Sequence, residues 1–140
     1  MSEIYSRCGY RCDLCPAFER NQTGPQDRER VSAGWEKYYN GFHMDPAQIV
    51  CAGCPFEGRH IDGGCPVRPC ANARGCVTCA DCSEYGSCDM LNKKLGAIQP
   101  IKDRHGDAMP AEDYRLFIAP YEAKEHLEQL RKKRSGGQQG

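Results

Sequence analysis

The sequence predicts a small, mainly α-helical domain stapled by metal, with irregular cysteine-rich loops like zinc-knuckle turns and little or no sheet. Three observations predict this class. Eleven of the 140 residues are cysteine. Ile, Leu, Val and Phe together make up about one residue in seven, which is too few for an ordinary hydrophobic core. The 19 basic and 19 acidic residues balance, so the chain lacks the net charge typical of disorder.

Metal ions, rather than disulfides, are the expected source of the missing stability. The first seven residues are polar and contain no apolar signal-peptide stretch. The cysteine number is odd, which does not suit a closed set of disulfides. No segment approaches the roughly 20 apolar residues of a membrane-spanning helix. We therefore expect a cytoplasmic protein without membrane contact, whose reduced thiols bind metal.

The charge pattern bears on partners. The basic run 131–134 is interpreted as a solvated helix end, stabilised there by the helix dipole. Thiolate zinc sites would make the folded protein acidic, so nucleic acid is not an expected partner. The partner class that we expect is another protein, which the sequence does not identify.

The N-terminal half predicts turns and then helices. A turn-rich segment over 3–18 carries the first cysteine cluster. Gly24-Pro25 opens a helix over 26–39, because proline suits the first helical position, and Asn40-Gly41 ends it. Its aromatic face is expected to pack in the core. A short second helix is expected from Asp45, the N-cap.

The second half alternates loops and helices. Glycines and prolines between Cys54 and Cys88 predict irregular loops, with one short helical piece near 69–74. A helix capped by Asp89 follows and ends at Gly96. Residues 98–107 are expected to form a linker.

The C-terminal part predicts a helical segment over 110–134. Tyr114, Phe117, Ile118 and Tyr121 have helical spacing, and Pro120 divides the segment. We expect a single domain over 1–134 with its cysteine-rich metal-binding core at 5–92, and a disordered tail at 135–140.

The spacing of the cysteines predicts two four-thiolate zinc sites. Cysteines two residues apart can reach one tetrahedral ion from a single tight turn. The repeated Cys-x2-Cys-Pro word assigns Cys12, Cys15, Cys51 and Cys54 to the first site, with Cys8 as a fifth candidate. The second site draws four ligands from Cys65, Cys70, Cys79, Cys82 and Cys88.

An iron–sulfur redox or sensor protein is the alternative. The spacing from Cys76 through Cys79 and Cys82 to Cys88 approaches the bacterial ferredoxin run, but its last interval is longer and no proline follows. The triplet Cys8, Cys12 and Cys15 also has the spacing of radical S-adenosylmethionine enzymes, which need a larger barrel than this chain can build.

No catalytic site is identified, and an enzyme is not predicted. Redox Cys-x2-Cys pairs open a helix within a βαβ unit, whereas proline follows both repeated pairs here. No pattern identifies a base for a nucleophilic thiol. The expected function is therefore that of an interaction module, acting through its aromatic or C-terminal helical surface.

Four motifs resemble the DUF3795 family of small cysteine-rich proteins. They are CGYRCDLCPAF at 8–18, CAGC at 51–54, CPVRPCA at 65–71 and CADCSEYGSC at 79–88. The resemblance covers roughly residues 5–92, and 114–130 also resembles the tail of some members. It implies an intracellular metal-binding protein and no known activity. Cys76 departs from the family pattern, which weakens the ferredoxin-like interpretation.

Overall fold

The computed structural model describes residues 3–61 and 65–139. Helices and irregular loops make up these ranges, with no sheet, which confirms the mainly helical class. Two isolated bridges, between Tyr5 and Arg11 and between Phe18 and Cys51, are the strand-like pairings within them. The start of the expected domain and residue 140 of the expected tail lie outside the described residues. No described helix is long and apolar enough to cross a membrane.

Helix α1 (Pro25–Tyr38) confirms the helix predicted over 26–39. Proline occupies its first turn, where a missing N–H costs nothing. Asn40 and Gly41 end it with positive φ angles of 58° and 76°, a conformation that Asn and Gly adopt most easily. Its buried residues are Val31, Ser32, Gly34, Trp35 and Tyr38. The helical part of the predicted aromatic face therefore belongs to the core, whereas Phe42, which follows the helix and was predicted on the same face, is exposed.

The cysteine-rich stretch differs from prediction in four details. The helix expected from Asp45 is only a 3-10 turn, η2 (Pro46–Gln48). The short piece near 69–74 begins earlier, as α2 (Val67–Ala73), and Cys79–Asp81 form a further 3-10 turn, η3. Helix α3 (Asp89–Leu95) is present, but Cys88 caps it, because the Cys88 sulfur accepts the Leu91 N–H at 3.4 Å.

Helix α4 (Gln99–His105) corrects the expected linker over 98–107. Its sequence lacks a continuous apolar stripe, so periodicity does not predict it. Tertiary contacts hold it instead. Ile101 packs against buried aromatic residues, and the Lys102 ammonium pairs with the Glu122 carboxylate at 2.6 Å.

The C-terminal segment is helical and divided, as predicted. Helix α5 (Ala111–Phe117) is followed by the 3-10 turn η4 (Ala119–Tyr121), which contains Pro120. Helix α6 (Ala123–Gln139) then continues past residue 135, where the sequence predicted the tail to begin. Adding one residue to an existing helix is far easier than nucleating one, although Gly136 and Gly137 disfavour this extension.

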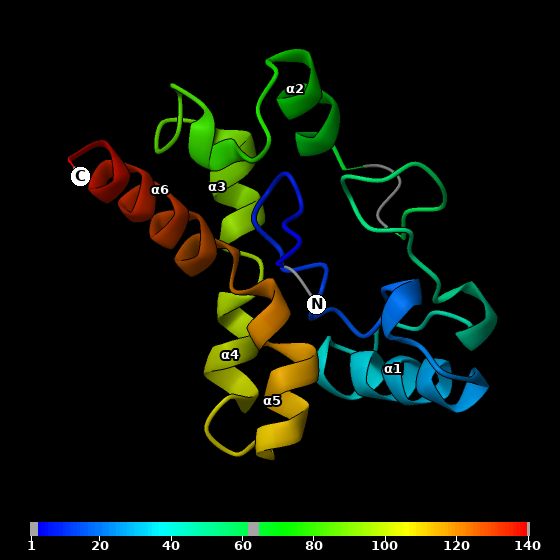
Figure 1. Ribbon diagram of the computed structural model, residues 1–140. Helices are drawn as coiled ribbons and strands as arrows, with labels where there is room; N and C mark the ends of the chain where they lie inside the picture. Colours follow the sequence, from blue (N-terminus) through cyan, green and yellow to red (C-terminus); the bar gives the residue numbers. More distant parts are fainter. Residues whose placement is uncertain (1–2, 62–64, 140) are drawn as a thin grey trace.

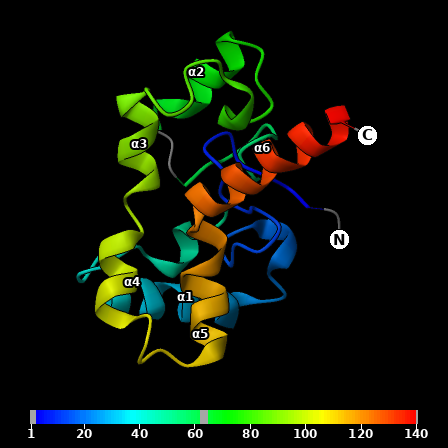
Figure 2. The same cartoon turned by 90° about the vertical axis from the view of Figure 1, so that its left-hand side faces the viewer.

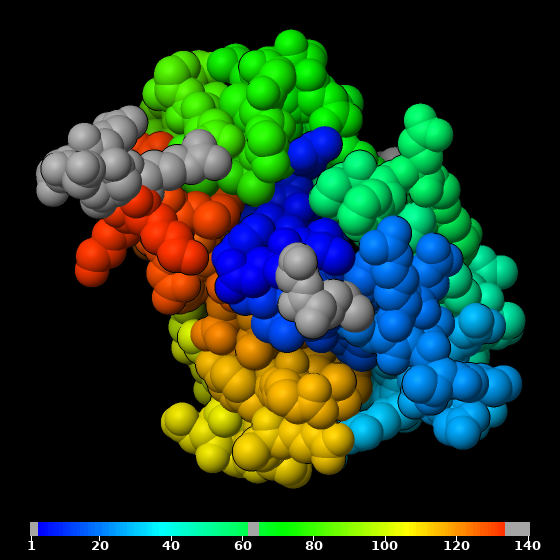
Figure 3. Space-filling view, viewed as in Figure 1, coloured from blue at the N-terminus to red at the C-terminus, as the bar shows by residue number. Residues whose placement is uncertain are grey.

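Two clusters of buried side chains form the interior. The aromatic core consists of Ala17, Val31, Trp35, Tyr38, Ile49 and Phe117. The cysteine core consists of Cys8, Val67, Ala71, Cys79, Ala80, Leu91 and Leu127. Figures 1 and 2 show α1, α4 and α5 at one end of the molecule and α2 and α3 at the other. The N-terminal segment runs between the two ends, and Figure 3 shows it on the surface beside them.

Candidate metal centres

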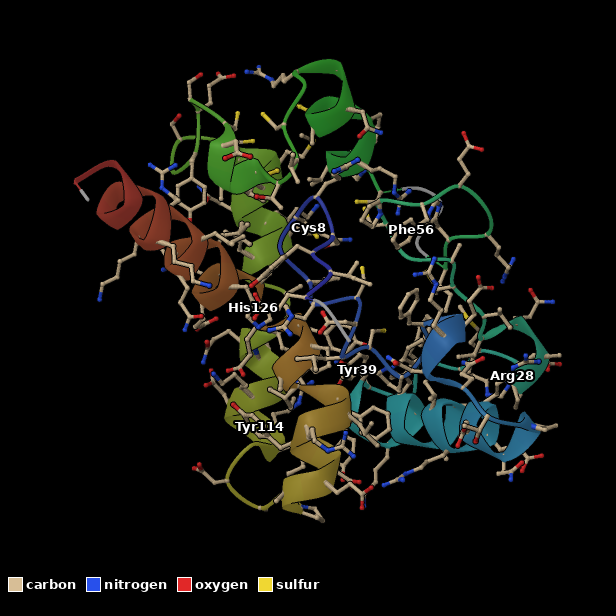
Figure 4. All side chains as sticks on the ribbon, in the orientation of Figure 1. Cys8, Arg28, Tyr39, Phe56, Tyr114 and His126 are labelled. Atoms are coloured by element: carbon tan, nitrogen blue, oxygen red, sulfur yellow. The ribbon has the colours of Figure 1, made fainter. Side chains whose placement is uncertain are left out.

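The N-terminal segment presents its first three cysteines on consecutive tight turns. The Cys15 N–H donates to the Cys12 carbonyl at 3.2 Å, which places both thiols on one turn. The φ angle of Gly9 is 100°, and a side chain there would overlap Leu127. The His126 ring bonds the Gly9 carbonyl through Nδ1 at 2.7 Å. Figure 4 shows Cys8 and His126 close to this junction with α6.

Two backbone hydrogen bonds hold the second Cys-x2-Cys pair against the first. The Cys51 N–H donates to the Ala17 carbonyl at 2.9 Å, and the Glu19 N–H donates to the Cys51 carbonyl at 2.9 Å. Segments more than 30 positions apart in the sequence are thereby fixed side by side. The structure thus brings together the two repeated pairs that the sequence assigned to one site.

A cavity of about 140 Å³ opens beside these pairs. We call it the six-cysteine cavity, since six thiols line it: Cys8, Cys12, Cys15, Cys51, Cys54 and Cys65. Cys65 was predicted among the ligands of the second site, but it lines this cavity instead. The rest of the wall includes the aromatic residues Trp35 and Tyr121 and the cationic residues Arg7, Arg68 and Lys94.

Cys12 lies among the other three members of the predicted first site. Burial raises the pKa of its thiol to about 12, the Cys54 N–H lowers it, and the charges of Cys15, Cys54 and Cys51 raise it further. Because these thiols each oppose the ionisation of Cys12, they can ionise together only if a cation offsets their repulsion. A bound metal ion would supply that cation and displace the protons.

Polar hydrogens face the sulfurs of the six-cysteine cavity. The Cys54 sulfur accepts the backbone N–H of Arg7 at 3.4 Å and the Nε–H of Arg68 at 3.3 Å. The Tyr121 hydroxyl lies 3.0 Å from the Cys15 sulfur. Burial raises the pKa of Cys15, whereas Tyr121 and two backbone N–H groups lower it. Such donors stabilise thiolate and orient metal-bound sulfur.

A smaller cavity, of about 40 Å³, lies between α2, η3 and α3. We call it the five-cysteine cavity, since Cys70, Cys76, Cys79, Cys82 and Cys88 line it. Burial raises the pKa of Cys79 to about 12, and the charges of Cys8, Cys82, Cys88 and Cys70 raise it further. Four predicted ligands of the second site therefore lie together, and Cys76, which the sequence left unassigned, lies beside them.

Arg74 is the cation of the five-cysteine cavity. Its Nη1 lies 3.8 Å from the Cys82 sulfur, and its guanidinium pairs with the Glu84 carboxylate. A hydrogen bond to Cys70 raises the pKa of Arg74, and the charges of Glu84 and Cys82 act in the same direction. This arrangement offsets part of the negative charge of a thiolate site.

Arg7 joins the two cavities through its backbone. Its N–H donates to the Cys54 sulfur, while its carbonyl accepts the Cys79 N–H at 2.7 Å. Its side chain donates to the carbonyl of Val77 at 2.7 Å. Sequence reasoning missed this residue, since no spacing rule marks it. It missed Trp35, Arg68 and Tyr121 as cavity residues for the same reason.

The thiols line the cavities rather than converging. Among residues 3–61 and 65–139, no three Cys, His, Asp or Glu side chains form a group that could hold a metal ion as they stand. Rotation about the Cα–Cβ bond moves a cysteine sulfur while the backbone stays fixed. Thiols around one cavity can therefore turn toward a bound group without refolding of the chain.

Comparison with known proteins identifies a family but no activity. Residues 4–93 match the family model described as "Protein of unknown function (DUF3795)". The match spans every cysteine of both cavities. No curated protein and no solved structure matches the chain.

Proposed function

This chain belongs to the DUF3795 family, and we propose that it is a metal-binding protein held together by two thiolate sites. One site uses thiols of the six-cysteine cavity and the other uses thiols of the five-cysteine cavity. The bound metal takes the place of the large apolar side chains that the cysteine core lacks. The metal-supported domain then acts as an interaction module. Its binding surface is not the aromatic face of α1, which is buried.

The division of the thiols carries the proposal. All eleven cysteines are free, and each lines one of two cavities. Cysteines that act only as small core residues need not lie close to one another. Cysteines that bind a metal ion must lie close together, since the cation offsets the mutual repulsion of their thiolates.

Zinc is the metal that we propose for the five-cysteine cavity. Its four grouped thiols, Cys70, Cys79, Cys82 and Cys88, match the ligand set of a closed structural zinc site. The Cys88 sulfur already accepts the Leu91 N–H, and Arg74 lies beside Cys82. For the six-cysteine cavity, Cys12, Cys15, Cys51 and Cys54 form the corresponding set. Four thiolates bind either zinc or iron there.

Metal analysis of protein purified without oxygen tests the proposal. We expect both sites to be filled, and a strong chelator to reduce the helical circular dichroism unless metal is restored. Thiol alkylation serves as the control, since chelation should increase the number of fast-reacting cysteines. A folded, metal-free protein with reduced thiols would contradict the proposal.

A further inference from the structure

The two cavities differ in size and in the number of thiols. The five-cysteine cavity measures about 40 Å³ and the six-cysteine cavity about 140 Å³. A structural zinc ion needs four thiolates around one point, with sulfurs about 2.3 Å from the metal. The smaller cavity suits such an ion. The larger cavity offers more thiols and more space than one tetrahedral ion uses.

A buried donor without a partner among the described residues belongs to a residue that lines the larger cavity. Trp35 lines this cavity with 6% of its surface exposed. Its indole Nε1–H is buried and has no hydrogen-bond partner within the described ranges. Leaving a buried donor unsatisfied is destabilising, so native proteins rarely do so. Indole nitrogen only donates, so a group bound beside Trp35 would satisfy this donor if it offered an acceptor.

The remaining wall suits an anionic, sulfur-rich group. The Arg7 N–H and the Arg68 Nε–H donate to the Cys54 sulfur at 3.4 and 3.3 Å, and Lys94 lines the same cavity. Iron–sulfur clusters carry negative charge spread over thiolates and inorganic sulfide, and hydrogen bonds to those sulfurs tune them. Sulfurs placed around a wall match a cluster with several iron atoms better than they match a single ion.

We infer that the six-cysteine cavity holds an iron–sulfur cluster, ligated by four of its thiols, whose sulfur accepts the Trp35 N–H. The inference rests on the proposed thiolate sites and assigns different occupants to them. Zinc remains in the five-cysteine cavity, so each chain contains two kinds of metal centre.

Elemental and sulfide analysis of the 140-residue chain, expressed and purified without oxygen in the presence of iron and zinc, tests this assignment. We expect about one zinc and equal amounts of iron and acid-labile sulfide, about two or about four of each per chain. Broad visible absorption should accompany them. Two zinc ions without sulfide would overturn the inference and leave the proposed function standing. A folded, metal-free protein would overturn both.

Matched serine variants test which cavity holds which centre. Cys54→Ser should lose the iron and sulfide and keep the zinc, whereas Cys82→Ser should lose the zinc and keep the iron and sulfide. The opposite pattern would overturn the assignment. If either variant fails to fold, the stoichiometry of the parent chain still decides between a cluster and a second zinc.

Trp35→Phe tests the hydrogen bond without removing a ligand. Phenylalanine preserves an aromatic side chain and removes the N–H. The variant should retain its iron and sulfide, and its reduction midpoint should shift to a more negative potential, because a donor to cluster sulfur favours the reduced state. Tyr38→Phe, on the same helix but outside the lining of this cavity, is the control. An unchanged midpoint would overturn the contact between Trp35 and the cluster.

Discussion

The aromatic core and the cysteine core are stabilised by different side chains. Trp35, Tyr38 and Phe117 fill the aromatic core, and each ring removes a large apolar surface from water. In the cysteine core, two alanines and two cysteines accompany only three large aliphatic residues. Side chains of that size bury little surface, so packing contributes less there. We therefore expect bound metal to contribute more to the stability of the cysteine core than to the stability of the aromatic core.

Removal of metal should produce the largest effect and should act first on the cysteine core. Structural zinc contributes an apparent binding free energy of about 10–16 kcal/mol, comparable with the whole stability of a domain. Hydrogen–deuterium exchange with mass spectrometry checks this after chelation. Peptides from α2 and α3 should lose protection before peptides from α1 and α5. Simultaneous loss at both ends would show that the two cores unfold as one unit.

Phe117→Ala should damage the aromatic core without removing metal. Phe117 is 2% exposed, and its ring occupies the space over Gly34 where any β-carbon would overlap it. The substitution should lower the free energy of unfolding by about 3–5 kcal/mol. Urea denaturation together with zinc analysis measures both quantities. Arg115→Ala, on the exposed side of the same helix, should change stability by less than about 0.5 kcal/mol. Zinc loss from folded Phe117→Ala would contradict the separation of the two regions.

Thr78→Ala should have an intermediate effect on the cysteine core. The Thr78 hydroxyl accepts the Ala80 N–H at 3.2 Å and caps the turn that carries Cys79. Loss of this cap should cost about 1 kcal/mol and weaken zinc binding at the five-cysteine cavity. Competition with a chromophoric chelator measures the zinc affinity. Thr78→Ser keeps a hydroxyl and should behave like the parent, whereas equal weakening by both variants would point to the lost methyl group.

Cys76→Ser should have the smallest effect. Its sulfur lies in the lining of the five-cysteine cavity and makes a long 4.0 Å contact with the Arg74 carbonyl oxygen. Zinc content should stay the same, and stability should change by about 0.5 kcal/mol or less. Loss of zinc from this variant would show that Cys76 is a zinc ligand, in place of one of the four cysteines proposed.

Local signals in the sequence predicted several elements correctly. Pro25 and the Asn40-Gly41 pair bounded α1, and Pro120 divided the C-terminal helices. Proline and glycine restrict the backbone wherever they occur, so their effect needs no tertiary context. Helix α4 was missed because its stability comes from contacts such as that between Lys102 and Glu122. No local pattern encodes such a contact.

The sequence predicted only those features of the candidate sites that depend on residues close together in the chain. The repeated Cys-x2-Cys words correctly indicated that Cys12 and Cys15 share a turn, since the spacing itself brings the thiols together. The neighbours of Cys65 and the role of Trp35 depend on segments that are distant in the sequence. The spacing of the cysteines in the sequence does not indicate which distant residues lie beside them.

The sequence by itself determined that the chain is rich in cysteine and poor in large aliphatic residues, which led us to predict that its thiols bind metal. Only the tertiary structure divided eleven thiols into sets of six and five around cavities of unequal size. The physical reason is that loop-closure entropy changes slowly with loop length, so many pairings of distant cysteines cost nearly the same. Long-range backbone bonds, such as Cys51 N–H to Ala17 and Cys79 N–H to Arg7, select one of them.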